Sequence, residues 1–151
     1  MTAKRECQWL WQDFEFRYLH GTVLASVHPG GISVAGETLD FEYSSTPLKF
    51  RAGASFSGGE EFSLRQASFS VSRLEAQCGN RSYALLRRGA FDRGRVITAE
   101  VGDVLATTPL TPRTLAVEEL PGEAAGIPLA DIVFMTWCCV LVDNPGTFTR
   151  S

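Results

Sequence analysis

The sequence predicts a mainly β fold, a closed antiparallel β-barrel of about 10–12 strands around a central hydrophobic C-terminal α-helix. Two observations lead to this prediction. Apolar residues recur with a spacing of two through most of the chain, which is the period of a half-buried strand. Near the C-terminus, every residue from Ile132 to Val142 except Thr136 is apolar. A helix without a polar face must be surrounded on all sides, so we expect the strands to enclose it.

The chain of 151 residues fits a single domain, residues 1–151. A domain of this size buries roughly 68–70% of the surface that its unfolded chain exposes, so a core is possible without disulfides or metals. Hydrophobic residues make up 44% of the chain, a proportion typical of globular proteins. The net charge of -3 gives no overall basic field, so we do not expect nucleic acid as a partner.

The strands are expected between about residues 8 and 117, with turn-forming residues between them. Their apolar positions are Trp9 and Trp11, Phe14 to Tyr18, Val23 to Val27, Ile32 and Val34, Leu39 to Tyr43, Leu48 and Phe50, Phe62 and Leu64, Phe69 and Val71, Tyr83 and Leu85, Val104 and Ala106, and Leu115 to Val117. An open sheet of this many strands would leave two edges exposed, and closure into a barrel removes them. The glycine-rich stretch 53–59 is expected to be a loop.

The C-terminal part is expected to carry the chain into the barrel. Residues 118–127 form a link, residues 128–143 the central helix, and residues 144–151 a short tail. Pro128 suits the first helical turn, where its missing N–H costs nothing, and Asp131 suits the positive end of the helix dipole. The apolar run is shorter than the about 20 residues that span a bilayer, so we expect no transmembrane segment.

The cysteines and tryptophans fit burial inside such a domain. Cys7, Cys78, Cys138 and Cys139 lack the spacing of a disulfide framework, which indicates free thiols in a reducing, cytoplasmic compartment. The N-terminus has no signal peptide pattern, and a peripheral position at a membrane stays open. Trp9 and Trp11 share one strand face, where they either cover the barrel wall or form an apolar spot for a partner. Trp137 would be the largest side chain of the helix.

The second half of the chain resembles a known superfamily. Residues 83–96 read Y-A-L-L-R-R-G-A-F-D-R-G-R-V, a strand, a short glycine-bearing turn and a strand, and lead into T-A-E-V-G-D-V-L-A-T at residues 98–107. With the apolar helix after a proline-containing link, this pattern is similar to the tubby C-terminal-like superfamily, which includes the tubby proteins, the LURP-one-related proteins and the phospholipid scramblases. The resemblance covers about the last 70 residues and implies a barrel threaded by its C-terminal helix.

The resemblance implies several functions. Tubby proteins bind membrane phosphoinositides through basic surface residues, scramblases are linked to lipid movement and calcium, and the LURP-one-related members have no agreed activity. The sequence contains neither an acidic calcium-binding loop of the scramblase kind nor a tubby lipid-binding signature. Neither function is therefore transferred by motif.

One charged cluster is a candidate ligand-binding site. It consists of arginines within residues 81–95, offset only by Asp92, namely Arg81, Arg87, Arg88, Arg93 and Arg95. On a hairpin, Arg87 with Arg93, or Arg88 with Arg95, could lie on one side and present paired guanidinium groups to a phosphate. The alternative is a solvated outer face of the barrel, with Glu75 and Glu100 nearby.

No catalytic or metal-binding pattern accompanies this cluster. His20 and His28 are the only histidines, and no Cys, Asp or Glu stands at a zinc-like spacing from them. The sequence lacks G-x-S-x-G, the P-loop pattern and H-E-x-x-H. We therefore expect no metal, no cofactor and no enzymatic activity.

These observations predict a non-enzymatic binding or scaffold module. Its ligand would be an anionic lipid head group or another phosphate-bearing molecule at the arginine-rich hairpin. Two alternatives stay open: a small-ligand carrier or enzyme with a site at the barrel mouth, and a protein–protein interaction domain.

Overall fold

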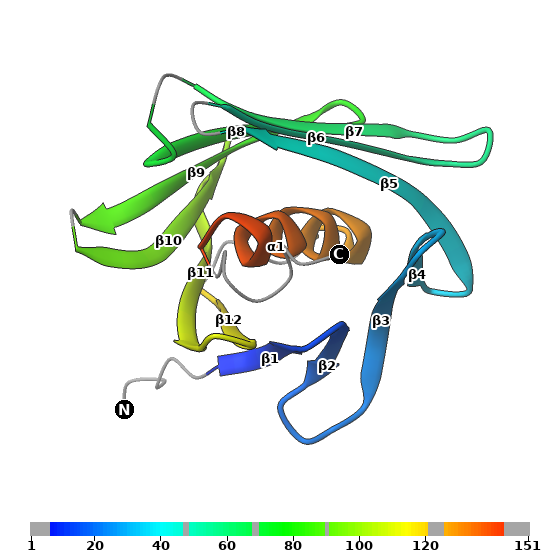
Figure 1. The fold of residues 1–151 in the computed structure, drawn as a ribbon, viewed down its shortest axis with the longest axis horizontal. Helices are drawn as coiled ribbons and strands as arrows, with labels where there is room; N and C mark the ends of the chain where they lie inside the picture. The colour runs from blue at the N-terminus through cyan, green and yellow to red at the C-terminus, as the bar shows by residue number, and fades with distance from the viewer. Residues whose placement is uncertain (1–6, 47–48, 68–69, 90, 121–125, 144–151) are drawn as a thin grey trace.

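A closed ring of antiparallel strands surrounds one helix in the computed structural model, which describes residues 7–46, 49–67, 70–89, 91–120 and 126–143 (Figure 1). The strands are β1 (Cys7–Gln12), β2 (Glu15–Tyr18), β3 (Val23–His28), β4 (Gly31–Val34), β5 (Glu37–Thr46), β6 (Lys49–Phe56), β7 (Glu61–Gln66), β8 (Arg73–Cys78), β9 (Arg81–Gly89), β10 (Asp92–Ala99), β11 (Gly102–Thr111) and β12 (Thr114–Glu119). The helix is α1 (Leu129–Asp143). The predicted fold class is confirmed.

Each strand pairs with its neighbours in the sequence, and β1 closes the barrel against β12. Because all neighbours are antiparallel, the hairpin turns alternate between the two ends of the barrel. We call the end with the β1–β2, β3–β4, β5–β6, β7–β8, β9–β10 and β11–β12 turns the basic end, and the other the acidic end, for charges described below. Closure leaves none of the twelve described strands as an unpaired edge.

The period-two pattern separates the inner and outer faces of the wall. On β7, Phe62 and Leu64 are buried inside, whereas Ser63 and Arg65 are exposed outside. The same alternation buries Leu74 and Ala76 on β8. The inward side chains form one hydrophobic core with the helix.

Helix α1 fills the centre of this core. Its side chains are buried from Asp131 through Leu141 and again at Asp143. Trp137 packs on Trp11 with ring centroids 5.0 Å apart, and Phe134 packs edge-on against Phe62 at 5.5 Å. Apolar contact therefore surrounds the helix, as its lack of a polar face requires.

The one polar side chain within the apolar run has two partners. The Thr136 hydroxyl donates to the carbonyl oxygen of Ile132 at 2.6 Å and accepts from Trp11 Nε1 at 2.7 Å. Both tryptophans of β1 are buried, so Trp9 and Trp11 serve packing rather than an exposed apolar spot. The Trp11–Thr136 bond also links β1 to the middle of the helix.

Some sequence-based expectations are wrong. The sequence predicts a strand at Phe69 and Val71, but the strand of this region, β8, begins at Arg73, and Val71 lies in a turn. The Ser72 N–H donates to Ser70 Oγ at 3.0 Å, and this hydrogen bond favours a turn over a strand. Residues 53–56, expected in a loop, belong to β6. Cross-strand pairing with β5 and β7 there overrides the low strand propensity of glycine and alanine. Phe14 and Tyr18 are exposed rather than buried, although the Phe14 ring contacts Trp137 of the helix, with ring centroids 6.1 Å apart.

The C-terminal boundaries shift slightly. Strand β12 extends through Glu119, so the link begins later than residue 118, and α1 begins at Leu129, one residue after Pro128. Leu48, Phe69, Ala90, part of the link and the tail 144–151 lie outside the described residues.

We predict that Trp137→Asp abolishes soluble expression, because it places a charge in the barrel core and removes contacts worth about 3–5 kcal/mol. Val101→Asp is the matched control, since Val101 is a 65% exposed apolar residue in the β10–β11 turn. Soluble yield and circular dichroism measure the outcome. A folded, well-expressed Trp137→Asp protein would contradict the central-helix packing.

Candidate functional site

The C-terminal end of α1 is held by arginines from β9 and β10. The Asp143 carboxylate accepts two bonds from Arg95, from Nε at 2.7 Å and Nη2 at 3.0 Å, and one from Arg87 Nη2 at 2.9 Å. Arg93 Nη1 donates to the Asp143 main-chain oxygen at 3.2 Å. Arg95 and Asp143 are both buried, and cations here also suit the negative end of the helix dipole.

The N-terminal end of α1 is held in the same way. Buried Asp131 accepts from Arg81 Nε at 2.7 Å, from Arg81 Nη2 at 3.0 Å and from the Tyr83 hydroxyl at 2.6 Å. Glu60 takes the outer side of the same guanidinium, with oxygens 2.9 and 3.1 Å from its nitrogens. Arg81 thus lies between two carboxylates, and each of its three guanidinium nitrogens donates a hydrogen bond to at least one of them.

The pKa values at this end follow from the contacts. The hydrogen bonds that Arg81 donates to Asp131 and then to Glu60 raise the pKa of Arg81 above its usual value. Burial, followed by the hydrogen bond to Asp131, raises the pKa of the Tyr83 hydroxyl. The hydrogen bond from Arg81 lowers the pKa of Glu60. All three groups are therefore fixed in one charge state near neutral pH.

Glycine is favoured beside this cluster. Gly79, in the β8–β9 turn, has a φ of +61°, which favours glycine. A Cβ atom there would lie 2.6 Å from Glu60 Oε2. The turn therefore leaves room for the carboxylate that covers Arg81.

The five predicted site arginines are not on one surface. Arg81, Arg87 and Arg95 turn inward to the helix carboxylates, and Arg93 reaches the last helical carbonyl. Arg88 alone lies on the outer face. Its Nη2 donates to Thr108 Oγ1 at 3.1 Å, and its Nε lies 3.3 Å from Asp92. The guanidinium crosses Gly94, where a Cβ atom would clash with it.

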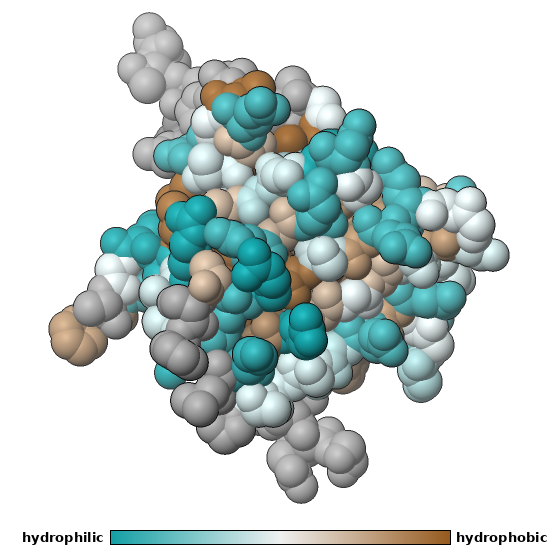
Figure 2. Space-filling view, turned by 90° about the horizontal axis from the view of Figure 1, so that it is seen from above, coloured by the Kyte–Doolittle hydropathy of each residue, from teal (hydrophilic) through white to brown (hydrophobic). Residues whose placement is uncertain are grey.

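Arg88 continues a row of cations along the outer face of β6, β7 and β8. We call Lys49, Arg51, Arg65, Arg73 and Arg88 the basic strip. Figure 2 looks onto this side of the barrel, where hydrophilic side chains gather. Arg51 and Arg65 stand directly opposite each other in the β6–β7 pairing. Like charges in that position destabilise a sheet.

Only part of this positive charge is neutralised. Glu75 accepts from Arg65 at 2.9 Å and from Arg73 at 3.2 Å. Within the described residues, no carboxylate forms an ion pair with Lys49 or Arg51, and both are exposed. The strip therefore carries excess positive charge at the Arg51 side.

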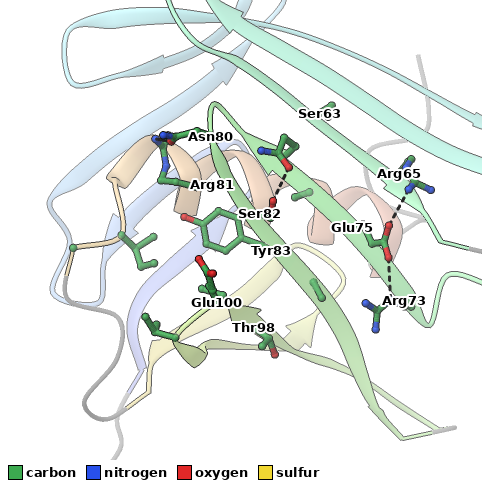
Figure 3. A pocket seen from close by; sticks show the side chains of 17 residues that line it. Ser63, Arg65, Arg73, Glu75, Asn80, Arg81, Ser82, Tyr83, Thr98 and Glu100 are labelled. Atoms are coloured by element: carbon green, nitrogen blue, oxygen red, sulfur yellow. Dashed lines mark hydrogen bonds and ion pairs between the residues drawn. The ribbon is translucent and has the colours of Figure 1, made fainter.

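A groove adjoins the basic strip on the outer faces of β7 to β10 (Figure 3). It has a volume of about 1000 Å³. Arg65 and Arg73 line one part, with Glu75 between them, while Asn80, Glu100 and the solvent-exposed side of Arg81 line another. Small polar residues such as Ser63, Ser82 and Thr98 lie between, so the groove offers hydrogen-bonding groups but few exposed aromatic faces.

The described residues contain no group of three or more His, Cys, Asp or Glu placed to hold a metal ion. His28 Nε2 lies 2.7 Å from Ser33 Oγ, and His20 stacks on Tyr18. No helix within the described ranges is both long and apolar enough to cross a membrane.

No protein-family model, no curated protein and no solved structure matches this chain. The relation to the tubby C-terminal-like superfamily stays a prediction, which rests on the hairpin and helix motifs.

Sequence reasoning missed the partners of the arginines. Asp131 and Asp143 bracket the apolar run, and an ionised carboxylate inside a barrel requires a cation. That signal was present in the sequence. The basic strip was harder to find, because Lys49, Arg51, Arg65 and Arg73 come from three strands whose register the sequence does not specify.

The buried cysteines yield a testable prediction. Burial is the main cause that raises the pKa of each of the thiols of Cys78, Cys138 and Cys139, and it brings the pKa of Cys139 to about 12. The negative charge of Asp131 raises the pKa of Cys78 further, and that of Asp143 raises the pKa of Cys139 further. In a Cys7→Ser variant, we expect these thiols to resist a thiol reagent at mildly alkaline pH and to react fully in denaturant. Rapid labelling of the folded protein would contradict the packing.

Proposed function

We propose that this chain is a non-enzymatic binding module that recognises phosphate-bearing anions through the basic strip. The observation that carries the proposal is a pair of facing cations on β6 and β7, of which only the one on β7 has a carboxylate partner among the described residues. Arg51 stands opposite Arg65, and Glu75 serves Arg65 but not Arg51. An anion bound between the two guanidinium groups would relieve their repulsion.

The chemistry of the strip suits a phosphate. A guanidinium presents parallel N–H groups that match two oxygens of a phosphate, and Lys49 adds a point charge at the start of β6. The adjoining groove leaves room for the rest of the ligand and supplies serine and threonine hydroxyls. A phosphate with a polar substituent is the ligand that both features favour.

The arginine-rich hairpin contributes less than the sequence indicated. Arg81, Arg87 and Arg95 are paired with helix carboxylates, so a ligand would have to compete with buried ion pairs to reach them. Arg88 is the member of that cluster that belongs to the basic strip. A carrier with its site inside the barrel gains no support, since Phe134 and Trp137 occupy the lumen.

The test measures binding of inositol hexakisphosphate by calorimetry. We predict that Arg51→Glu weakens binding by about tenfold or more, because a charge-assisted hydrogen bond contributes about 1.5–3 kcal/mol. Arg17→Glu is the matched control: Arg17 lies on β2 and pairs with Glu15, away from the strip. Wild-type affinity should fall as salt rises.

Two results would refute the proposal. One is the absence of binding by the wild-type protein at low salt. The other is an equal loss of affinity in Arg51→Glu and Arg17→Glu, which would mean that overall charge, not the strip, governs binding.

A further inference from the structure

We infer that the partner bearing these phosphates is an anionic bilayer surface. The basic end of the barrel contacts this surface, and two hairpin tips insert into the lipid interface. This inference rests on the proposed function and names the source of the anion. The reasons are the exposed apolar tips and the distribution of charge between the two ends.

Two neighbouring hairpins expose large apolar side chains at the basic end. Phe91, in the β9–β10 turn, is fully exposed, and Leu110, near the β11–β12 turn, is 57% exposed. Strands β10 and β11 are paired, and both turns lie at the same end of the barrel. Each side chain projects from a tip rather than forming part of a flat apolar face.

Cations flank these tips. Arg88 and Arg93 lie on either side of Phe91 in the sequence, and Arg113 follows Leu110 in the next turn. Asp92 pairs with Arg88, and Asp13 of the β1–β2 turn pairs with Arg113, so the net positive charge beside the tips comes from Arg93, which forms no ion pair with a carboxylate of the described residues. Apolar side chains that project among cations are the pattern by which a protein lies in the interface of an anionic membrane.

The opposite end carries the opposite charge. Acidic residues lie at or near its turns, namely Glu37, Glu60, Glu61, Glu100 and Asp103. Within the described residues there, Arg81 is paired with Glu60 and Asp131. An anionic surface would repel this end and attract the other, so the charges orient the barrel before contact.

The basic strip continues toward the same end. Lys49 begins β6 and Arg73 begins β8, and both strands start at the basic end. A bilayer would therefore meet the strip and the tips together. A soluble phosphate compound could engage the strip, but it would leave Phe91 and Leu110 in water.

The experiment places an environment-sensitive fluorophore, NBD, on single cysteines. Phe91→Cys and Leu110→Cys report on the tips, and Val101→Cys, an exposed apolar residue at the other end, is the control. All three are made in the Cys7→Ser background, where the remaining described thiols are buried. The protein is mixed with vesicles of phosphatidylcholine and phosphatidylserine, with phosphatidylcholine alone, or with inositol hexakisphosphate.

We expect blue-shifted, stronger emission at positions 91 and 110 on the anionic vesicles, quenched by spin-labelled lipid, and no shift at position 101. Phosphatidylcholine alone and inositol hexakisphosphate should leave all three spectra unchanged. Phe91→Ser/Leu110→Ser should weaken vesicle binding at least about tenfold and leave binding of inositol hexakisphosphate intact. Val101→Ser should change neither, and thermal melting confirms that each variant is folded.

The outcomes separate this inference from the function on which it rests. Binding of inositol hexakisphosphate without vesicle binding, or equal shifts at positions 91 and 101, would overturn the docking inference alone. Unchanged vesicle binding by Phe91→Ser/Leu110→Ser would do the same. Failure to bind either probe would overturn both proposals.

Discussion

The structure depends on two arginine–carboxylate contacts that hold an apolar helix in place inside a barrel. Apolar packing stabilises the helix but is non-directional, so alone it fixes neither depth nor rotation well. Asp131 binds Arg81 and Tyr83 near one end of the barrel, and Asp143 binds Arg95 and Arg87 near the other. All these arginines come from β9 and β10, so one hairpin sets the position of α1 along its length.

This arrangement divides the charged residues between two tasks. The inward arginines of the hairpin neutralise carboxylates that the helix brings into the core, and burial makes that pairing obligatory. Among the outward cations on β6 to β9, Arg51 and Lys49 form no ion pair with a carboxylate in the part of the chain that the structure describes, so their charge faces solvent. Because successive side chains of a β-strand point to opposite faces, Arg87 points inward to Asp143, whereas its neighbour Arg88 lies on the outer face.

The fold could be predicted because its signals are local. Period-two patterning and one apolar run with carboxylates at its ends are visible in the sequence, and they indicate both barrel and central helix. The candidate site could not be predicted, because the register of strand pairing decides which of its residues lie next to each other. Arg51 and Arg65 lie opposite each other only because of the register of the β6–β7 pairing. The turn at Ser70 and Ser72 makes the next strand begin at Arg73 rather than near Val71. Composition alone does not distinguish the buried Arg95 from the outer Arg88.

The most direct measurement of the helix-fastening role is a double-mutant cycle on Arg95 and Asp143, read as the free energy of urea unfolding. Arg95→Met and Asp143→Leu should each cost about 3–5 kcal/mol, because each leaves a buried charge without its main partner. The double variant should recover about 2–3 kcal/mol of the summed loss. Single costs that simply add in the double variant would show that the two side chains do not act together, and would contradict this account of the barrel.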